Sequence, residues 1–238
     1  MRNNIAEMQF LYNQESISTQ FSKEKFRQFL QEDMIFPLTG VKKKYRKNDI
    51  IISEGQAVNE IYFIESGDVV ARKESEKVID FFAKNEIIGL TNLLLDSQSE
   101  YSVQVISSEL VVTKYDKESI IEKVINTQEG YFYHYVHMQN QVSRMMEKEE
   151  LLRQPAEQRI SLALHTLVTK FGEATNDPDL TGFPKSISKG MIAQYTNLNP
   201  NTITNILQKL QEEGIIYPAR RAFYIDTFQL QLKLDSIL

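Results

Sequence analysis

The sequence predicts an α+β chain with a β-rich N-terminal part, a long central helix and a C-terminal winged helix-turn-helix. Three observations support this prediction. Short β-rich segments separated by turn signals run from Ile35 to Tyr115. An apolar stripe at steps of three and four residues begins at Tyr131. Two short helical patterns meet at Thr196-Asn197-Leu198, and a hairpin pattern follows them. We therefore predict three parts, spanning 1–129, 130–153 and 154–238.

Composition excludes several classes of protein. The 238 residues include no cysteine, which rules out disulfides, thiolate zinc sites, iron–sulfur clusters and cysteine nucleophiles. No apolar run reaches membrane-spanning length, and the N-terminus does not resemble a signal peptide, so we expect a cytoplasmic protein without membrane contact. The net charge of −5 lies entirely before Glu150, and the remaining C-terminal part is neutral. A neutral module with locally clustered basic residues can still bind DNA.

The N-terminal part combines a helix with many strands. Ser22 can cap a helix in which Phe26, Phe29 and Leu30 share one face. The short strands that follow are typical of a sandwich or small barrel. One of them contains the basic run 42–47, which favours a solvated edge strand whose lysines discourage pairing with another chain.

The stripe from Tyr131 predicts a long helix with a coiled-coil-like seam. The seam favours dimerisation, and the alternative is a helix packed on its own sandwich. Two histidines on this helix, His134 and His137, are more typical of ordinary helix residues than of a metal or haem site. Pro155 ends the helix or marks a hinge, and beyond a further helix we expect a polar loop from Gly172 to Thr181. The seam residues assigned to dimerisation are Tyr135, Met138, Val142, Met145 and Leu152.

The segment 188–214 predicts a helix-turn-helix. Ser188 can cap the first helix, and Asn199 can cap the second, with Pro200 at its first position. Ala193 is small enough for a close helix crossing, and Asn197 tolerates the positive φ that the turn requires. Apolar residues recur at helical spacing along the second helix, at Ile203, Ile206, Leu207 and Leu210.

The opposite face of the second helix carries uncharged donors and acceptors that can meet base edges in a major groove. The alternative is an ordinary helical hairpin with a polar face. The hairpin pattern around residues 215–225 favours the winged helix-turn-helix. The base-reading candidates are Asn201, Thr202, Thr204, Asn205 and Gln208, and the candidate phosphate contacts are Ser188, Lys189, Lys209, Arg220 and Arg221.

This order of elements resembles the Crp/Fnr superfamily of bacterial transcription regulators over nearly the whole chain. The residues that carry the resemblance are segment 62–69 (YFIESGDV), segment 87–89 (IIG) and the helix-turn-helix. Segments 88–93 and 105–109 are most similar to the PrfA-like subgroup of Gram-positive bacteria. The resemblance implies an N-terminal cyclic-nucleotide-binding-like β-roll (a jelly roll), a long dimerisation helix and a winged helix-turn-helix.

The sequence departs from relatives that bind cyclic nucleotides. Where they carry a Gly-Glu-Leu segment and an Arg-Ser pair, this chain has Gly89-Leu90-Thr91 and Glu100-Tyr101. Leu90 cannot accept a hydrogen bond from a ribose hydroxyl, and Glu100 would repel a phosphate. We therefore expect no cyclic nucleotide and no iron–sulfur cofactor. An unidentified small effector remains open, and its pocket is predicted near Tyr62, Phe82, Tyr101 and Tyr131.

The expected partners are duplex DNA and a second copy of the chain, with RNA polymerase added if the protein is an activator. Asparagine pairs best with adenine and threonine can contact a thymine methyl, so an A·T-rich palindrome is predicted, with half-sites about one helical turn apart. The alternative is an effector-binding sensory module that acts through protein partners instead of DNA. No phosphate loop or hydrolase motif is present, so we do not expect an enzyme.

Overall fold

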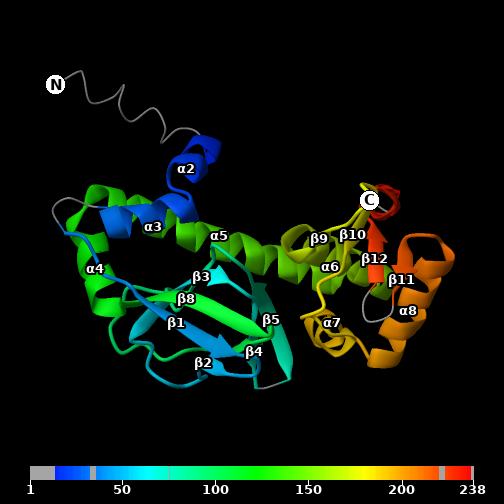
Figure 1. Cartoon of the computed structure of the whole chain (residues 1–238), viewed down its shortest axis with the longest axis horizontal. Helices are drawn as coiled ribbons and strands as arrows, with labels where there is room; N and C mark the ends of the chain where they lie inside the picture. The colour runs from blue at the N-terminus through cyan, green and yellow to red at the C-terminus, as the bar shows by residue number, and fades with distance from the viewer. Residues whose placement is uncertain (1–13, 33–35, 75, 220–222, 237–238) are drawn as a thin grey trace.

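The computed structural model describes residues 14–32, 36–74, 76–219 and 223–236. Figure 1 shows a β-roll at one end, a winged domain at the other and the long helix α5 (Gln128–Arg153) running between them. Helices α2 (Gln14–Gln20) and α3 (Lys23–Glu32) lie above the roll, and α4 (Lys117–Asn126) precedes α5. The arrangement confirms the predicted α+β class.

The roll consists of two four-stranded antiparallel sheets, in the orders β1-β8-β3-β6 and β2-β7-β4-β5. Side chains that are inaccessible to solvent, among them Ile64, Val69 and Val112, fill the space between the sheets. The predicted sandwich is therefore present. Its strands are β1 (Val41–Arg46), β2 (Ile50–Ile52), β3 (Glu60–Ser66), β4 (Val69–Lys73), β5 (Lys77–Phe82), β6 (Ile87–Ile88), β7 (Ser102–Val105) and β8 (Glu109–Asp116).

Strand β1, which carries the basic run, lies at the edge of its sheet. Its first four residues, Val41 to Lys44, are exposed. Exposed lysines on an edge strand oppose pairing with another sheet because like charges would meet there. The predicted edge strand is confirmed. Helix α3 buries Phe26 and Leu30 in a cluster with Phe63 of β3 and Tyr133 of α5.

Helix α5 has two different apolar faces. One face buries Tyr133 and Val136 against the roll and the N-terminal helices. The predicted seam lies on the other face, where Tyr135 is 52%, Val142 51% and Met145 70% exposed. The helix therefore packs on its own roll and still presents an uncovered stripe. Leu152 departs from that stripe, because it is partly buried against the core of the C-terminal domain.

The C-terminal domain begins after Pro155 with α6 (Ala156–Phe171) and continues into α7 (Lys189–Thr196) and α8 (Pro200–Glu212). The hairpin is formed by β11 (Ile216–Pro218) and β12 (Phe223–Asp226), and α9 (Thr227–Asp235) follows it. The predicted polar loop from Gly172 to Thr181 is a loop only in its middle, at 175–179. Two short strands there, β9 (Glu173–Ala174) and β10 (Leu180–Gly182), extend the hairpin to a four-stranded sheet, order β11-β12-β10-β9.

The C-terminal domain and the roll share a continuous apolar core. Phe81 of β5 is 1% exposed and lies between Phe171 and Tyr195, at ring-centroid distances of 6.2 and 5.4 Å. Helix α7 packs on β5 in consequence. Within the described residues, no helix is long and apolar enough to cross a bilayer.

Candidate nucleic-acid interface and effector cavity

The turn between α7 and α8 has the local geometry that the sequence predicts. The Ser188 hydroxyl accepts a hydrogen bond from the Met191 N–H at 3.2 Å, and the Asn199 side chain accepts one from the Asn201 N–H at 2.8 Å. Asn197 adopts the left-handed conformation, with φ of 51° and ψ of 47°. Both caps and the special turn residue are therefore confirmed. Together they fix the direction in which α8 leaves the turn.

Helix α8 separates its residues by chemistry. Ile203, Leu207 and Leu210 are buried in the domain core. On the outer face, the side chains of Asn201, Thr204, Asn205 and Gln208 are exposed, and Thr202 is half-buried. Figure 1 places α8 at the end of the molecule that is farthest from the roll. Among the described residues, the side chains of this polar face make only two hydrogen bonds, both local, from Thr204 to the Pro200 carbonyl and from Gln208 to Glu212.

A groove of about 750 Å³ lies between α8, the start of α7 and the hairpin. It brings together predicted phosphate and base contacts from both helices. Lys185 also lines it, although the sequence analysis did not single this residue out. The only signal for Lys185 is its position three residues before the α7 cap. The predicted residues lining the groove are Ser188, Lys189, Thr204 and Gln208.

Two of the predicted phosphate contacts have restricted roles, and two lie outside the described residues. Lys209 forms an ion pair with Glu157 at 2.6 Å, within a cluster that also includes Lys233 and Glu213. Its ammonium therefore links α8 to α6 and is engaged within the domain. The Ser188 hydroxyl is engaged in the helix cap. Residues Arg220 and Arg221 fall in the part of the hairpin tip that the structure does not describe.

Of the four residues predicted around an effector pocket, the structure brings only Phe82 and Tyr101 together in one cavity. Phe82 and Tyr101 line a cavity of about 300 Å³ between the roll and the second half of α5. Tyr62 lies in the other sheet, where its hydroxyl donates to Glu60 at 2.7 Å. Tyr131 is 53% exposed near the start of α5, 13 residues before Arg144 and so about 20 Å along the helix axis. Sequence spacing alone did not reveal which sheet or helical turn each tyrosine occupies.

The cavity also contains charged residues that the sequence analysis missed. Arg144 and Lys148 line it from α5, and Tyr195 lines it from α7. The Lys148 ammonium donates to the Tyr195 carbonyl and lies over the tyrosine ring, 2.9 Å from its centroid. Burial lowers the pKa of Lys148 to about 7, and Asp80 opposes that effect. Among the described residues, Lys148 has no carboxylate within ion-pair distance.

The segment from Gly89 to Tyr101, which the resemblance aligns with a cyclic-nucleotide site, is held in place by a lysine of this chain. Lys117, at the start of α4, is 1% exposed. Its ammonium donates to the Ser97 hydroxyl at 2.7 Å, the Leu94 carbonyl at 2.8 Å and the Asn92 side chain at 3.3 Å. Leu90 is buried, whereas Glu100 is exposed and pairs with Lys73. Loop 92–97 is therefore held in place by the buried ammonium group of Lys117.

The two histidines of α5 differ in their surroundings, because His137 is hydrogen-bonded within the protein whereas the buried Nε2 of His134 has no hydrogen-bond partner among the described residues. His137 is buried, and its Nε2 lies 2.9 Å from the Leu90 carbonyl and 2.7 Å from the Gln141 side-chain nitrogen. Burial lowers the pKa of His137 to about 4 and also lowers that of His134. In the described part of the chain, no three potential ligands of the His, Asp or Glu type gather at one point. The interpretation of His134 and His137 as ordinary helix histidines stays a prediction.

Comparisons with known proteins agree with this architecture. Residues 42–126 match the model of the cyclic nucleotide-binding domain. Electron transport regulator A of Shewanella oneidensis is 20% identical over 188 residues, which cover 74% of this chain and 70% of that protein. FixK2 from Bradyrhizobium japonicum has a TM-score of 0.70 at 17% identity, covering 82% of this chain and 96% of that one.

Two further solved structures have the same arrangement. A cyclic nucleotide-binding domain containing protein from Listeria monocytogenes has a TM-score of 0.69 at 20% identity, covering 87% of this chain and 99% of that one. TTHB099, a transcriptional regulator of the CRP family from Thermus thermophilus, has a TM-score of 0.66 at 18% identity, covering 81% and 96%. The similarity to the PrfA-like subgroup stays a prediction. Residues 42–126 thus match the cyclic nucleotide-binding domain, and the fold of the chain is similar to that of these solved regulator structures.

Proposed function

We propose that this protein is a sequence-specific DNA-binding transcription regulator that acts as a homodimer and without cyclic nucleotide. The observation that supports it most is the outer face of α8. Asn201, Thr204, Asn205 and Gln208 are exposed on one side of a helix whose other side is buried in the domain core. A capped helix that projects amides and hydroxyls can enter a major groove and meet base edges.

The phosphate contacts belong to the groove beside α8. Lys185 and Lys189 line it, together with the α7 cap residue Ser188, so the N-terminus of α7 lies at the same groove. We propose that these groups, with Arg220 and Arg221 of the hairpin tip, hold the DNA backbone. Because the C-terminal part is neutral overall, we expect DNA binding to depend moderately on salt. For each phosphate that the protein neutralises, the logarithm of the binding constant should fall by about 0.9 for a tenfold increase in salt concentration.

The dimer follows from the uncovered stripe on α5. Tyr135, Val142 and Met145 are exposed on a helix of 26 residues, with half-buried Met138 between them. Such a stripe is stabilised when a second copy covers it, because apolar surface leaves water. A two-fold dimer presents two α8 helices, and so it reads a palindrome whose half-sites are about one helical turn apart.

A cyclic nucleotide is not part of the proposal. The buried apolar Leu90 and the carboxylate of Glu100 stand where relatives bind ribose and phosphate, and Lys117 engages the loop between them. If a small molecule regulates the protein, we propose that it binds in the cavity of Phe82 and Tyr101, whose walls are mainly apolar. The proposal assigns no catalysis and places the protein in the cytoplasm, with RNA polymerase as a partner if it activates transcription.

The test is selection of binding sites from random duplex DNA at a fixed, stated salt concentration. We expect the purified protein to enrich an A·T-rich palindrome with half-site centres separated by about 10 base pairs. Enrichment of a G·C-centred half-site would overturn the base assignments. Failure to retain any duplex at low salt would favour the alternative, a sensory module that acts through protein partners.

A further inference from the structure

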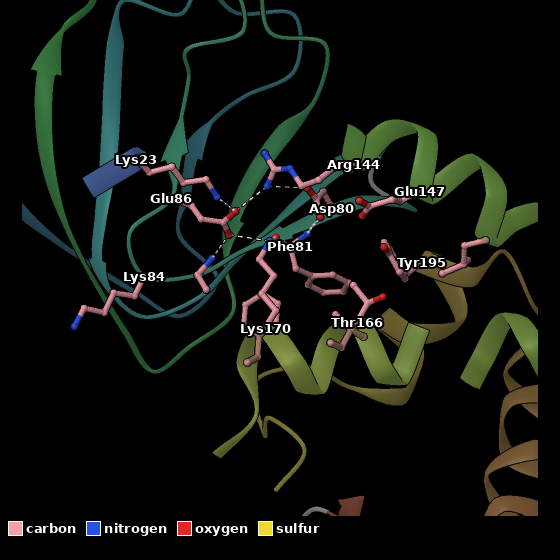
Figure 2. Close-up of a pocket in the computed structure, with 14 residues that line it drawn as sticks. Lys23, Asp80, Phe81, Lys84, Glu86, Arg144, Glu147, Thr166, Lys170 and Tyr195 are labelled. Atoms are coloured by element: carbon pink, nitrogen blue, oxygen red, sulfur yellow. Dashed lines mark hydrogen bonds and ion pairs between the residues drawn. The ribbon is translucent and has the colours of Figure 1, made fainter. Parts of the chain in front are cut away.

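A single buried carboxylate connects three separated segments of this protein. Glu86 lies in the turn between β5 and β6, and its side chain is 7% exposed. One carboxylate oxygen accepts a hydrogen bond from the Ala83 N–H at 2.8 Å, which fixes the side chain to its own turn. Figure 2 shows Lys23, Arg144 and Lys170 converging on this carboxylate from different directions, while Lys84 points away.

The three cations come from three different helices. Lys23 of α3 lies 3.2 Å from Glu86, Arg144 of α5 lies 2.7 Å away, and Lys170 of α6 lies 2.8 Å away. Burial alone would raise the pKa of Glu86, but the charges of Lys170 and Lys23 hold it below the ordinary value. The carboxylate is therefore ionised at neutral pH. One negative charge thus holds the N-terminal helix, the long helix and the C-terminal domain against the roll.

Lys170 is the member of this group that belongs to the C-terminal domain. Its ammonium also donates to the Phe81 carbonyl at 2.5 Å and lies near the rings of Phe82 and Phe171, at 5.6 and 5.5 Å from their centroids. Two further hydrogen bonds cross the same junction, from Ser186 to Asp68 at 2.8 Å and from Arg72 to Gln194 at 2.5 Å. Of these three donors, Lys170 is the one that pairs with the buried carboxylate of Glu86.

We propose that Glu86 is a positioning residue for DNA recognition, which acts through Lys170 to hold the winged domain at one orientation on the roll. The connection from α5 to α6 consists of Gln154 and Pro155, so side-chain contacts must set the angle between the domains. In a dimer, that angle fixes the separation of the two α8 helices. The effect on DNA affinity rests on the proposed function, whereas the effect on domain orientation does not.

The chain offers a matched pair of variants. Lys170→Met and Lys23→Met each remove one cation from the same carboxylate, and the two side chains are 25% and 32% exposed. Among the described residues of the C-terminal domain, only Lys170 pairs with Glu86. Methionine has nearly the shape of the apolar part of a lysine side chain, so each variant removes mainly the positive charge. Glu86→Gln removes the shared partner, and thermal unfolding identifies any variant that fails to fold.

Domain orientation is measured by pulsed electron paramagnetic resonance. The chain has no cysteine, so cysteines introduced at exposed Lys47 and Gln229 carry the only spin labels. Labelled chains are mixed with excess unlabelled chains, so that the measured distance lies within one chain. We expect one narrow distance for the parent and for Lys23→Met, and a broadened distribution for Lys170→Met and for Glu86→Gln. An unchanged distribution in folded Lys170→Met or Glu86→Gln overturns the proposal.

The same variants are then tested on the selected operator. If the freed domain spends about a tenth of its time in the docked orientation, Lys170→Met binds the operator about tenfold more weakly, because only that fraction is competent. Lys23→Met is expected to bind as the parent does. Tighter binding by Lys170→Met would show that the docked orientation opposes DNA binding and would overturn the positioning role. If the parent binds no DNA, the proposed function fails, and the distance measurement still decides whether Glu86 sets the orientation.

Discussion

Replacing Asn205 with Ala should remove discrimination at one base pair in each half-site and leave the fold intact. The Asn205 side chain is exposed on α8 and makes no hydrogen bond to the rest of the described chain. Alanine is the better helix former by a few tenths of a kcal/mol, so the thermal midpoint should not fall. A bidentate amide–adenine contact contributes about 1–3 kcal/mol of discrimination, which is roughly fivefold to 150-fold.

A symmetric dimer loses this contact twice, so the total loss of discrimination is about 2–6 kcal/mol. The assay is competition binding between the selected operator and a version substituted at one base pair in both half-sites, at constant salt. Two control variants are measured in the same assay. Asn176→Ala removes an equally exposed amide from the loop before β10 and should change nothing. Lys189→Ala should weaken binding to all sequences alike and, because one lysine is lost from each subunit, reduce the salt slope by about 1.8. Equal weakening by Asn205→Ala on every sequence would refute the base-reading role.

Three further outcomes are expected. Met145→Glu should dissociate the dimer in analytical ultracentrifugation, because it places charge on the uncovered stripe, whereas Met146→Glu, at 66% exposure beside the stripe, should leave the mass unchanged. Asn197→Val should destabilise the protein by about 1–2 kcal/mol in urea unfolding, because a β-branched residue is strained at φ of 51°, while Asn197→Gly should not. Burial lowers the pKa of Lys148 to about 7, so between that pH and 10.5 the unfolded state binds more protons and stability should rise with pH. Lys148→Met should lose this rise, and an identical pH dependence in both proteins would contradict the assignment.

The helix-turn-helix could be predicted in detail because its signals are local. Ser188, Asn197 and Asn199 each act on backbone groups within three residues, so residue type and spacing are sufficient. The two faces of α8 follow in the same way from its periodicity. Strands β9 and β10 could not be predicted from the polar segment, because β10 pairs with Tyr224, Ile225 and Asp226, more than 40 residues away.

The effector cavity and the ion pairs of Glu86 also depend on residues that are far apart in the sequence, and for that reason they could not be predicted from it. Phe82 and Tyr101 share a cavity while Tyr62 does not, and the difference depends on which sheet each strand joins. Glu86 and Lys23 meet across 63 positions of sequence, with no periodic pattern between them. The charge of a lysine or glutamate on a helix indicates a solvated face, and only the packing of roll, helix and winged domain shows that this carboxylate is buried.

The lysine beneath loop 92–97 sets a condition on any attempt to make this protein respond to a cyclic nucleotide. Its ammonium already satisfies the Ser97 hydroxyl and the Leu94 carbonyl. Installing arginine at position 100 would supply a charge for the phosphate but would leave the loop in its present shape. Re-engineering such a response therefore requires at least two coordinated changes, one that adds a phosphate ligand and one that releases Lys117.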